Sequence, residues 1–129
     1  MIFIIGGRCS GKLEYVLNLY NLSNEDILEG SELDINCPIS KPIINNFHLL
    51  IKKLLKDYDD IDYIKEKIDY LLNTNKEVII ISDEIGYGIV PIEKFDREYR
   101  EFVGRISCDI AKRSNEVHRV IAGIGSRIK

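Results

Sequence analysis

The sequence predicts a three-layer α/β domain with a mainly parallel sheet. Three observations favour this fold: an apolar run at residues 2–5 that ends in two glycines, a second apolar run at 78–81, and amphipathic helical patterns around them. Short continuous runs rich in β-branched residues are typical of strands that helices cover on both faces. At 129 residues, the chain is long enough for one compact core, so we expect a single domain over 1–129.

The spacing of apolar residues and the positions of glycine and proline predict the elements. In chain order we expect a central strand at 2–5, a helix at 13–21, a weak strand at 27–28, helices at 47–55 and 61–72, a strand at 78–81, a helix from Pro91 to Ile110, and a strand at 116–122. Residues 123–129 are expected to form a basic tail. The sheet should therefore have about four or five strands.

Composition narrows the classes of partner. The formal net charge is -3, and 18 Lys and Arg are interspersed with 21 Asp and Glu, which disfavours nucleic acid. Cys9, Cys37 and Cys108 lie far apart without a C-x-x-C pair, so neither a disulfide framework nor a zinc site is expected. The run at 2–5 is too short for a signal peptide or a membrane span. We therefore expect a soluble cytoplasmic protein without nucleic-acid or membrane partners.

The loop after the first strand matches the P-loop pattern G-x-x-x-x-G-K. Glycines allow successive backbone N–H groups to curl around phosphate oxygens, and the following helix N-terminus favours negative charge. The alternative is a glycine turn with a solvated lysine. We predict a P-loop nucleotide-binding domain for ATP or GTP, with phosphate contacts from Gly6, Gly7, Arg8, Cys9, Ser10, Gly11, Lys12 and Leu13.

Acidic residues expected near this loop are candidates for catalysis and for binding Mg²⁺. A P-loop normally ends in Ser or Thr, whose hydroxyl coordinates Mg²⁺, whereas this chain has Leu13. Asp83 and Glu84 follow the strand at 78–81, where open α/β sheets bind ligands. We predict Lys12, Asp83 and Glu84 as catalytic residues, and Asp83 with Glu29 as Mg²⁺ ligands. The alternative for Asp83 and Glu29 is that each carboxylate only caps a turn at a strand end.

Residues 82–91, with the sequence SDEIGYGIVP, resemble the N-E-V-G-x-G-I-V-P signature of the adenosylcobinamide kinase / adenosylcobinamide-phosphate guanylyltransferase family. Arg97, Arg100, the pair Gly104-Arg105 and the ending at 123–125 continue the resemblance, which covers somewhat more than half of the chain. It implies a P-loop fold, phosphorylation of the aminopropanol hydroxyl of adenosylcobinamide, guanylyl transfer from GTP by a histidine, and rings of three subunits. Gly86 and Gly88 flank Tyr87, and this loop is expected to order nucleotide or acceptor.

Departures from the family pattern leave several hypotheses open. The segment that carries the family's histidine appears shortened, and His48 is interpreted as a partly exposed helix residue rather than a phosphoramidate-forming nucleophile, with His118 weaker still. At three positions the chain departs from the family pattern: it has Cys9 where the family has arginine, Leu13 where the family has serine, and Asp83 where the family has asparagine. One hypothesis is an ATP- or GTP-dependent kinase for a corrinoid alcohol in cobalamin biosynthesis, with the nucleotidyltransferase half lost. The others are a degenerate nucleotide- or corrinoid-binding paralogue with an accessory role and a kinase for an unrelated metabolite. No motif distinguishes ATP from GTP.

Overall fold

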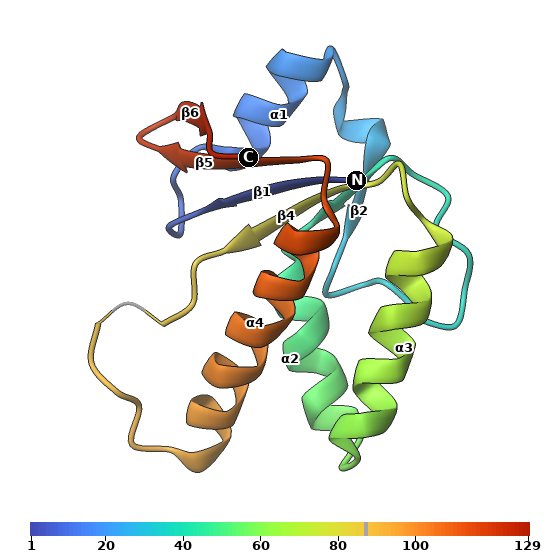
Figure 1. Cartoon of the computed structure of the whole chain (residues 1–129), viewed down its shortest axis with the longest axis vertical. Helices are drawn as coiled ribbons and strands as arrows, with labels where there is room; N and C mark the ends of the chain where they lie inside the picture. Colours follow the sequence, from blue (N-terminus) through green and yellow to red (C-terminus); the bar gives the residue numbers. More distant parts are fainter. Residues whose placement is uncertain (87) are drawn as a thin grey trace.

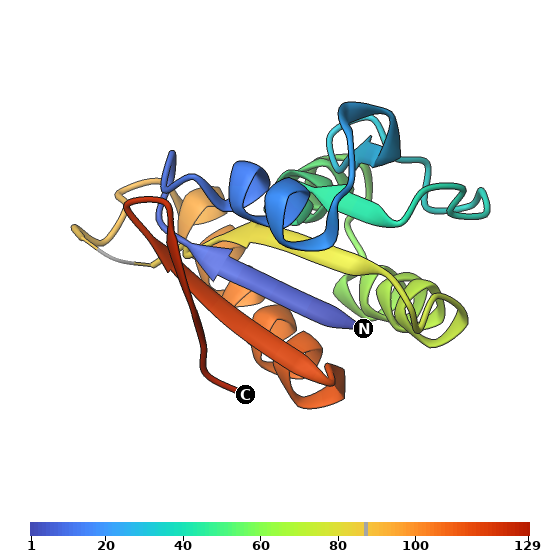
Figure 2. The ribbon, with the colours of Figure 1, turned by 90° about the horizontal axis from the view of Figure 1, so that it is seen from above.

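The sheet is built around the N-terminal strand. The computed structural model describes residues 1–86 and 88–129, so that Tyr87 of the signature loop lies outside the described residues. The strands are β1 (Ile2–Gly6), β2 (Ile27–Glu29), β3 (Ile43–Asn45), β4 (Ile79–Asp83), β5 (Glu116–Ile121) and β6 (Ile124–Arg127). They form one sheet in the order β2-β3-β4-β1-β5-β6. Strands β1 to β5 are parallel and β6 is antiparallel to β5. Figure 2 shows β1 between β4 and β5.

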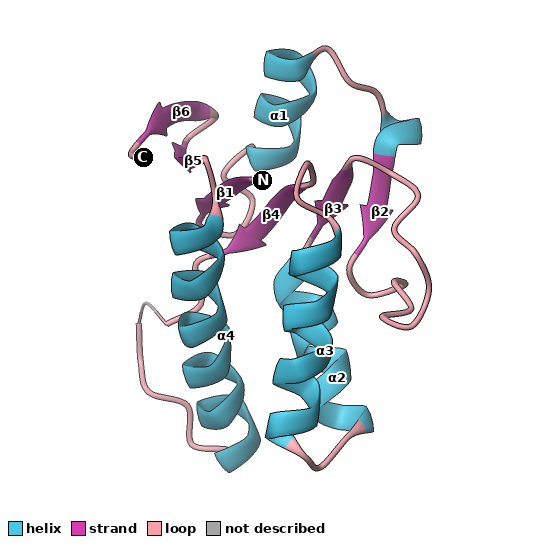
Figure 3. Ribbon diagram, turned by 45° about the vertical axis from the view of Figure 1, so that its right-hand side comes forward, coloured by secondary structure: helices cyan, strands magenta, loops and turns pink. Residues whose placement is uncertain are grey.

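Helices cover both faces of the sheet, which confirms the predicted three layers. The helices are α1 (Lys12–Tyr20), α2 (Phe47–Asp57), α3 (Ile61–Thr74) and α4 (Lys94–Arg113), and a short 3₁₀ turn spans Asn24–Asp26. Helix α1 lies on one side of the strands, and α2, α3 and α4 lie on the other (Figures 1 and 3). Within the described residues, no helix combines the length and the apolar character needed to cross a bilayer.

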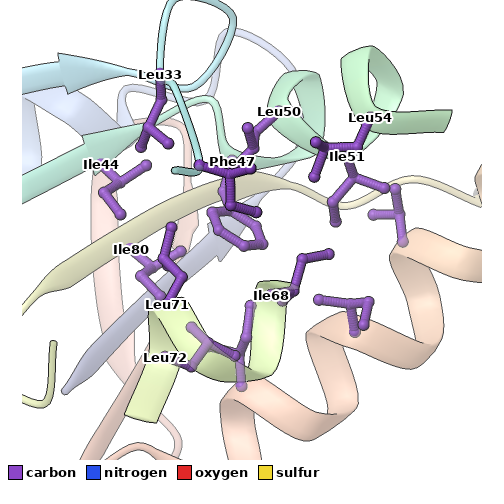
Figure 4. Packing of buried hydrophobic residues seen from close by; sticks show 14 of the residues in the cluster. Leu33, Ile44, Phe47, Leu50, Ile51, Leu54, Ile68, Leu71, Leu72 and Ile80 are labelled. Atoms are coloured by element: carbon purple, nitrogen blue, oxygen red, sulfur yellow. The ribbon is translucent and has the colours of Figure 1, made fainter. Parts of the chain in front are cut away.

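The sequences of β1 and of most of β4 are continuously apolar because these strands face two cores. Ile80 of β4 packs on the side of α2, α3 and α4, whereas its neighbours Ile79 and Ile81 pack on the side of α1. Figure 4 shows the larger core, in which Phe47 and Ile68 meet the sheet. Burial of each such side chain contributes about 1.5–3 kcal/mol to folding. These two cores hold the carboxyl ends of β1, β3 and β4 in fixed positions.

Four sequence predictions were wrong in detail. The sheet has six strands rather than the four or five expected. Strand β3 was not predicted, because three residues are too few to show a periodic pattern. Residues 123–129 were predicted as a tail, but 124–127 form β6. This strand pairs with β5 through a two-residue turn in which Ala122 and Gly123 both have positive φ, 49° and 78°, as a type I′ hairpin requires. Helix α4 begins at Lys94 rather than at Pro91.

Candidate active site

The glycine-rich loop joins β1 to α1 at the carboxyl edge of the sheet. Gly11 has a φ of 84° and precedes the first residue of the helix, Lys12. This left-handed conformation favours glycine, and it turns the chain directly into α1. Among the residues that the structure describes, the backbone N–H groups of Gly11, Lys12 and Leu13 donate to no protein acceptor. A helix N-terminus with free N–H groups is suited to bind phosphate.

Lys12 is buried over this loop and pairs with Asp83. Its Nζ lies 2.7 Å from Asp83 Oδ1 and donates to the carbonyl oxygen of Gly7 at 2.7 Å. The side chains of Lys12 and Asp83 are 7% and 14% exposed. The contact follows from the topology, because β1 and β4 are parallel neighbours and Gly6 is in register with Asp83. The structure thus brings together two of the three predicted catalytic residues.

A cavity of about 630 Å³ opens beside this pair. Its volume lies within the range of about 300–1,000 Å³ that is typical of small-molecule sites. The loop, α1, α2, α4 and the ends of β3 and β4 all contribute to its wall. The lining residues are Arg8, Cys9, Ser10, Gly11, Lys12, Leu13, Glu14, Asn45, Asn46, His48, Leu49, Lys52, Asp83, Ile85 and Tyr99.

His48 is part of this site, which corrects the expectation of a partly exposed histidine on a helix surface. The residue is 6% exposed, and its Nδ1 accepts the backbone N–H of Asp83 at 3.1 Å. Since a backbone N–H can only donate, the proton of the neutral ring is on Nε2. Nε2 lies 3.5 Å from Asp83 Oδ2, which is long for a hydrogen bond. His48 therefore presents an N–H donor in the cavity.

The environment of His48 keeps the ring neutral. Burial lowers the pKa of His48 below its ordinary value, and this effect outweighs the Asp83 carboxylate, which raises the pKa. The ammonium groups of Lys12 and Lys52 lower the pKa further. The contact between His48 Nε2 and Asp83 Oδ2 is therefore one between a neutral imidazole and a carboxylate, and not an ion pair.

Tyr99 and Lys52 also line the cavity, and sequence reasoning did not assign either to the site. The Tyr99 hydroxyl donates to the carbonyl oxygen of His48 at 3.1 Å and so connects α4 to the first turn of α2. Burial raises the pKa of Tyr99 to about 12, with a further contribution from Asp83, so the hydroxyl keeps its proton at neutral pH. The Nζ of Lys52 lies 5.4 Å from the centre of the Tyr99 ring.

Glu29 and Glu84, the other two acidic residues predicted for the site, interact with residues other than Lys12. Glu29 accepts hydrogen bonds from the side-chain amides of Asn45 at 2.8 Å and Asn46 at 2.9 Å, and it does not line the cavity. Glu84 forms a bidentate pair with Arg119, with Nε–Oε1 and Nη2–Oε2 distances of 2.9 and 3.2 Å. The Glu29 carboxylate thus holds the two asparagine side chains at the end of β3, and the Glu84 carboxylate holds Arg119 of β5. Asp83 is the carboxylate that faces Lys12.

The potential metal ligands are few. No group of three or more His, Cys, Asp or Glu side chains within the described residues is arranged to hold a metal. Mg²⁺ that accompanies a nucleotide is usually held by one or two carboxylates together with phosphate oxygens, a pattern that Asp83 fits. Leu13 provides no ligand, and its side chain packs partly into the core beneath α1.

The signature loop after β4 is held by arginines of α4. Arg100 donates to the carbonyl oxygens of Gly86 and, at 3.3 Å, Ile89. Arg97 donates to the carbonyl oxygens of Pro91, at 3.2 Å, and Ile92. The arginines and the glycine-rich run of the sequence resemblance therefore belong to one structural unit beside the site.

Comparisons with known proteins agree with the resemblance. The chain is 34% identical over 84 residues to the bifunctional adenosylcobalamin biosynthesis protein CobU of Escherichia coli, covering 57% of this chain and 46% of that protein. It is 38% identical over 53 residues to the protein of the same name from Salmonella typhimurium, covering 41% of this chain and 29% of the relative. The chain thus spans less than half the length of these curated relatives. A family model described as cobinamide kinase / cobinamide phosphate guanyltransferase matches residues 38–128, well over half of the chain, and the chain therefore belongs to this family.

Proposed function

We propose that this chain binds a purine nucleoside triphosphate at the glycine-rich loop and transfers the terminal phosphoryl group to a hydroxyl of a cobinamide-type corrinoid, in cobalamin biosynthesis. The family description and the names of the relatives support the substrate class. The observation that supports the chemistry best is the 2.7 Å contact between Lys12 and Asp83 beside the glycine-rich loop. It places a cation and a carboxylate at one side of a cavity large enough for the terminal phosphate and an alcohol.

Each group has a defined part in this reaction. The N–H groups of Gly11, Lys12 and Leu13 bind phosphate oxygens, and Lys12 exchanges one of its present acceptors for the outer phosphates. Asp83 accepts a hydrogen bond from the acceptor hydroxyl and then its proton. A bond forms between that oxygen and the terminal phosphorus, while the bond to the oxygen that bridges the two outer phosphates breaks. Mg²⁺ bound to the triphosphate, with Asp83 as its protein ligand, would neutralise charge on the phosphate oxygens.

His48 is suited to donate a hydrogen bond rather than to act as a nucleophile. A ring nitrogen that forms a phosphoramidate needs a free lone pair. The Nδ1 lone pair accepts the N–H of Asp83, and Nε2 carries the proton. In the transition state, the Nε2–H group can stabilise charge on a phosphoryl oxygen.

The other histidine has partners on both nitrogens. His118 Nδ1 is 2.8 Å from the Tyr15 hydroxyl, and Nε2 is 3.0 Å from Glu116 Oε2. The ring is buried, with 5% exposed. Since the sequence has two histidines, these contacts support loss of the guanylyltransferase half from this chain.

A second candidate is a nucleotide- or corrinoid-binding protein without turnover. Leu13 favours it, because the side chain at the position of the metal-binding hydroxyl packs partly into the core. In this case the loop would bind a triphosphate independently of Mg²⁺.

Phosphate transfer and binding measurements separate the two candidates. Triphosphates labelled at the terminal phosphate are incubated with cobinamide, and calorimetry measures nucleotide binding with and without Mg²⁺. The kinase predicts labelled cobinamide phosphate and Mg²⁺-dependent binding, whereas the binding protein predicts affinity alone. Lys12→Ala should weaken binding in both cases, and Lys65→Ala, at an exposed position of α3, is the matched control. Unchanged affinity of Lys12→Ala would contradict both candidates.

A further inference from the structure

Lys52 is a half-buried cation in the wall of the cavity at Lys12. Within residues 1–86 and 88–129, its ammonium group forms no hydrogen bond and no ion pair with a protein group. The next residue, Lys53, by contrast donates to the carbonyl oxygen of Leu33 at 3.3 Å. Because burial of a charge is costly unless the charge is paired, a half-buried ammonium group without an acceptor is complementary to an anion in the cavity.

The position of Lys52 is set by Tyr99 of α4. The Tyr99 ring is 8% exposed, and its hydroxyl donates to the carbonyl oxygen of His48, so the ring is fixed against α2. The ammonium group of Lys52 lies over this ring, an arrangement that attracts a cation. Lys52 follows His48 by four residues, and the two therefore lie on one face of α2. This face presents two donors to the cavity, the Nε2–H group of His48 and the ammonium group of Lys52.

The cavity has more positive than negative charge. The lining residues that the structure describes include three cations, Arg8, Lys12 and Lys52, and two carboxylates, Glu14 and Asp83. Lys12 and Asp83 neutralise each other. The ammonium groups of Lys12 and Lys52 both lower the pKa of His48, so both lie within electrostatic range of that ring. An anionic group beside His48 can therefore be contacted by one lysine from α1 and by another from α2.

The glycine-rich loop itself lacks one means of neutralising phosphate charge. In P-loop enzymes a Ser or Thr after the lysine holds Mg²⁺, and a cation from outside the loop can stabilise the charge on the transferred phosphoryl group. Leu13 has no oxygen to offer. Lys52 is outside the loop, on a different helix, and lines the same cavity. Its position thus meets the requirement for such a cation.

We propose, on the basis of the triphosphate binding argued above, that Lys52 binds the terminal phosphate of the nucleotide from the α2 side of the cavity. Its ammonium group donates hydrogen bonds to the phosphate oxygens and keeps its protons, and the Nε2–H group of His48 donates to a neighbouring oxygen. Lys12 and the N–H groups of the loop contact the same phosphate chain from the α1 side. In the proposed transfer, Lys52 stabilises the charge on the group that moves.

Calorimetry tests this assignment through the ratio of triphosphate to diphosphate affinity, measured with ATP, ADP, GTP and GDP at a fixed Mg²⁺ concentration. Lys52→Met keeps the apolar stem and removes the charge, and Lys52→Arg keeps the charge. The matched control is Lys56→Met, because Lys56 is an exposed residue of α2 that does not line the cavity. Lys12→Ala tests the loop. Lys52→Gln is a second neutral variant in case Lys52→Met does not fold.

We expect the ratio to fall about tenfold or more in Lys52→Met, because a charge-assisted hydrogen bond to the terminal phosphate is lost. The diphosphate, which lacks that phosphate, should bind Lys52→Met and the unaltered chain with similar affinity. Lys52→Arg should retain most of the ratio, since its side chain is also a charged donor. Lys56→Met should retain all of it, which separates a contact in the cavity from a general effect of net charge.

The outcomes distinguish this proposal from triphosphate binding itself. If triphosphates bind and Lys12→Ala weakens them, but the ratio is the same in Lys52→Met as in the unaltered chain, the assignment of Lys52 is wrong and the proposed function stands. An equal fall of the ratio in Lys52→Met and Lys56→Met would also overturn the assignment. If no triphosphate binds the unaltered chain, or Lys12→Ala has no effect, the proposed function fails and the assignment of Lys52 fails with it.

Discussion

The Nδ1 atom of His48 accepts the backbone N–H of Asp83 at 3.1 Å, across 35 positions of sequence. This hydrogen bond connects the first turn of α2 to the end of β4, and it sets two properties of the site. It leaves the proton of the neutral imidazole on Nε2, and it holds the backbone from which the Asp83 carboxylate reaches Lys12.

The hydrogen bond predicts how two substitutions of His48 differ in stability. His48→Leu leaves the N–H of Asp83 without its acceptor, and the loss should be about 1–3 kcal/mol in the free energy of unfolding. His48→Asn places an amide oxygen near the position of Nδ1, so a smaller loss is expected. Urea denaturation measures both values. Equal losses for the two variants would contradict the role of the hydrogen bond.

The lowered pKa of His48 predicts a pH dependence of stability. Because burial holds the pKa below the ordinary value of about 6.5, the unfolded chain binds more protons at this residue than the folded chain as the pH falls below about 6.5. The contribution of His48 is therefore present at neutral pH and declines on acidification. Urea midpoints at pH 7.5 and 5.5 should fall more for the unaltered chain than for His48→Asn. A parallel fall in the two proteins would show that His48 titrates normally.

Leu13 provides a test of the metal site. Leu13→Thr introduces a hydroxyl at the position where P-loops hold Mg²⁺, and it removes apolar contact with the core beneath α1. We expect a loss of about 1–2 kcal/mol in the free energy of unfolding and a rise of about tenfold or more in Mg²⁺-dependent phosphoryl transfer. Leu13→Val, which adds no oxygen, is the control for packing. A gain of activity in Leu13→Val would argue against metal coordination as the cause.

Cysteine alkylation reports nucleotide at the loop. Cys9, Cys37 and Cys108 are all exposed, but only Cys9 lines the cavity at Lys12 among the described residues. A saturating triphosphate should slow alkylation of Cys9 several-fold, because the ligand covers the loop, and mass spectrometry of peptides measures each site. Cys37 and Cys108 serve as internal controls. Equal protection of all three cysteines would indicate a global effect and not a ligand at the loop.

The sequence by itself determined the elements that depend on local pattern and on residue type. Ile2–Gly6 and Ile79–Asp83 are strands buried on both faces, and their continuous apolar sequences predicted this because only such residues suit two cores. Local spacing likewise predicted the loop before Lys12 and the position of Asp83 at a strand end. The signature at 82–91 led to the family that the comparisons confirmed.

The tertiary structure decided which groups meet. Strand β3 is too short to predict, yet it orients Asn45 and leads into His48, so its absence from the predicted fold left His48 on an apparent surface. The pairing of Glu84 with Arg119 and of Glu29 with two asparagines also depends on strand order. These contacts join residues 16 to 35 positions apart, and the spacing of residues along a chain carries no information about partners at that distance. Packing of the two cores against the sheet is what brings them together.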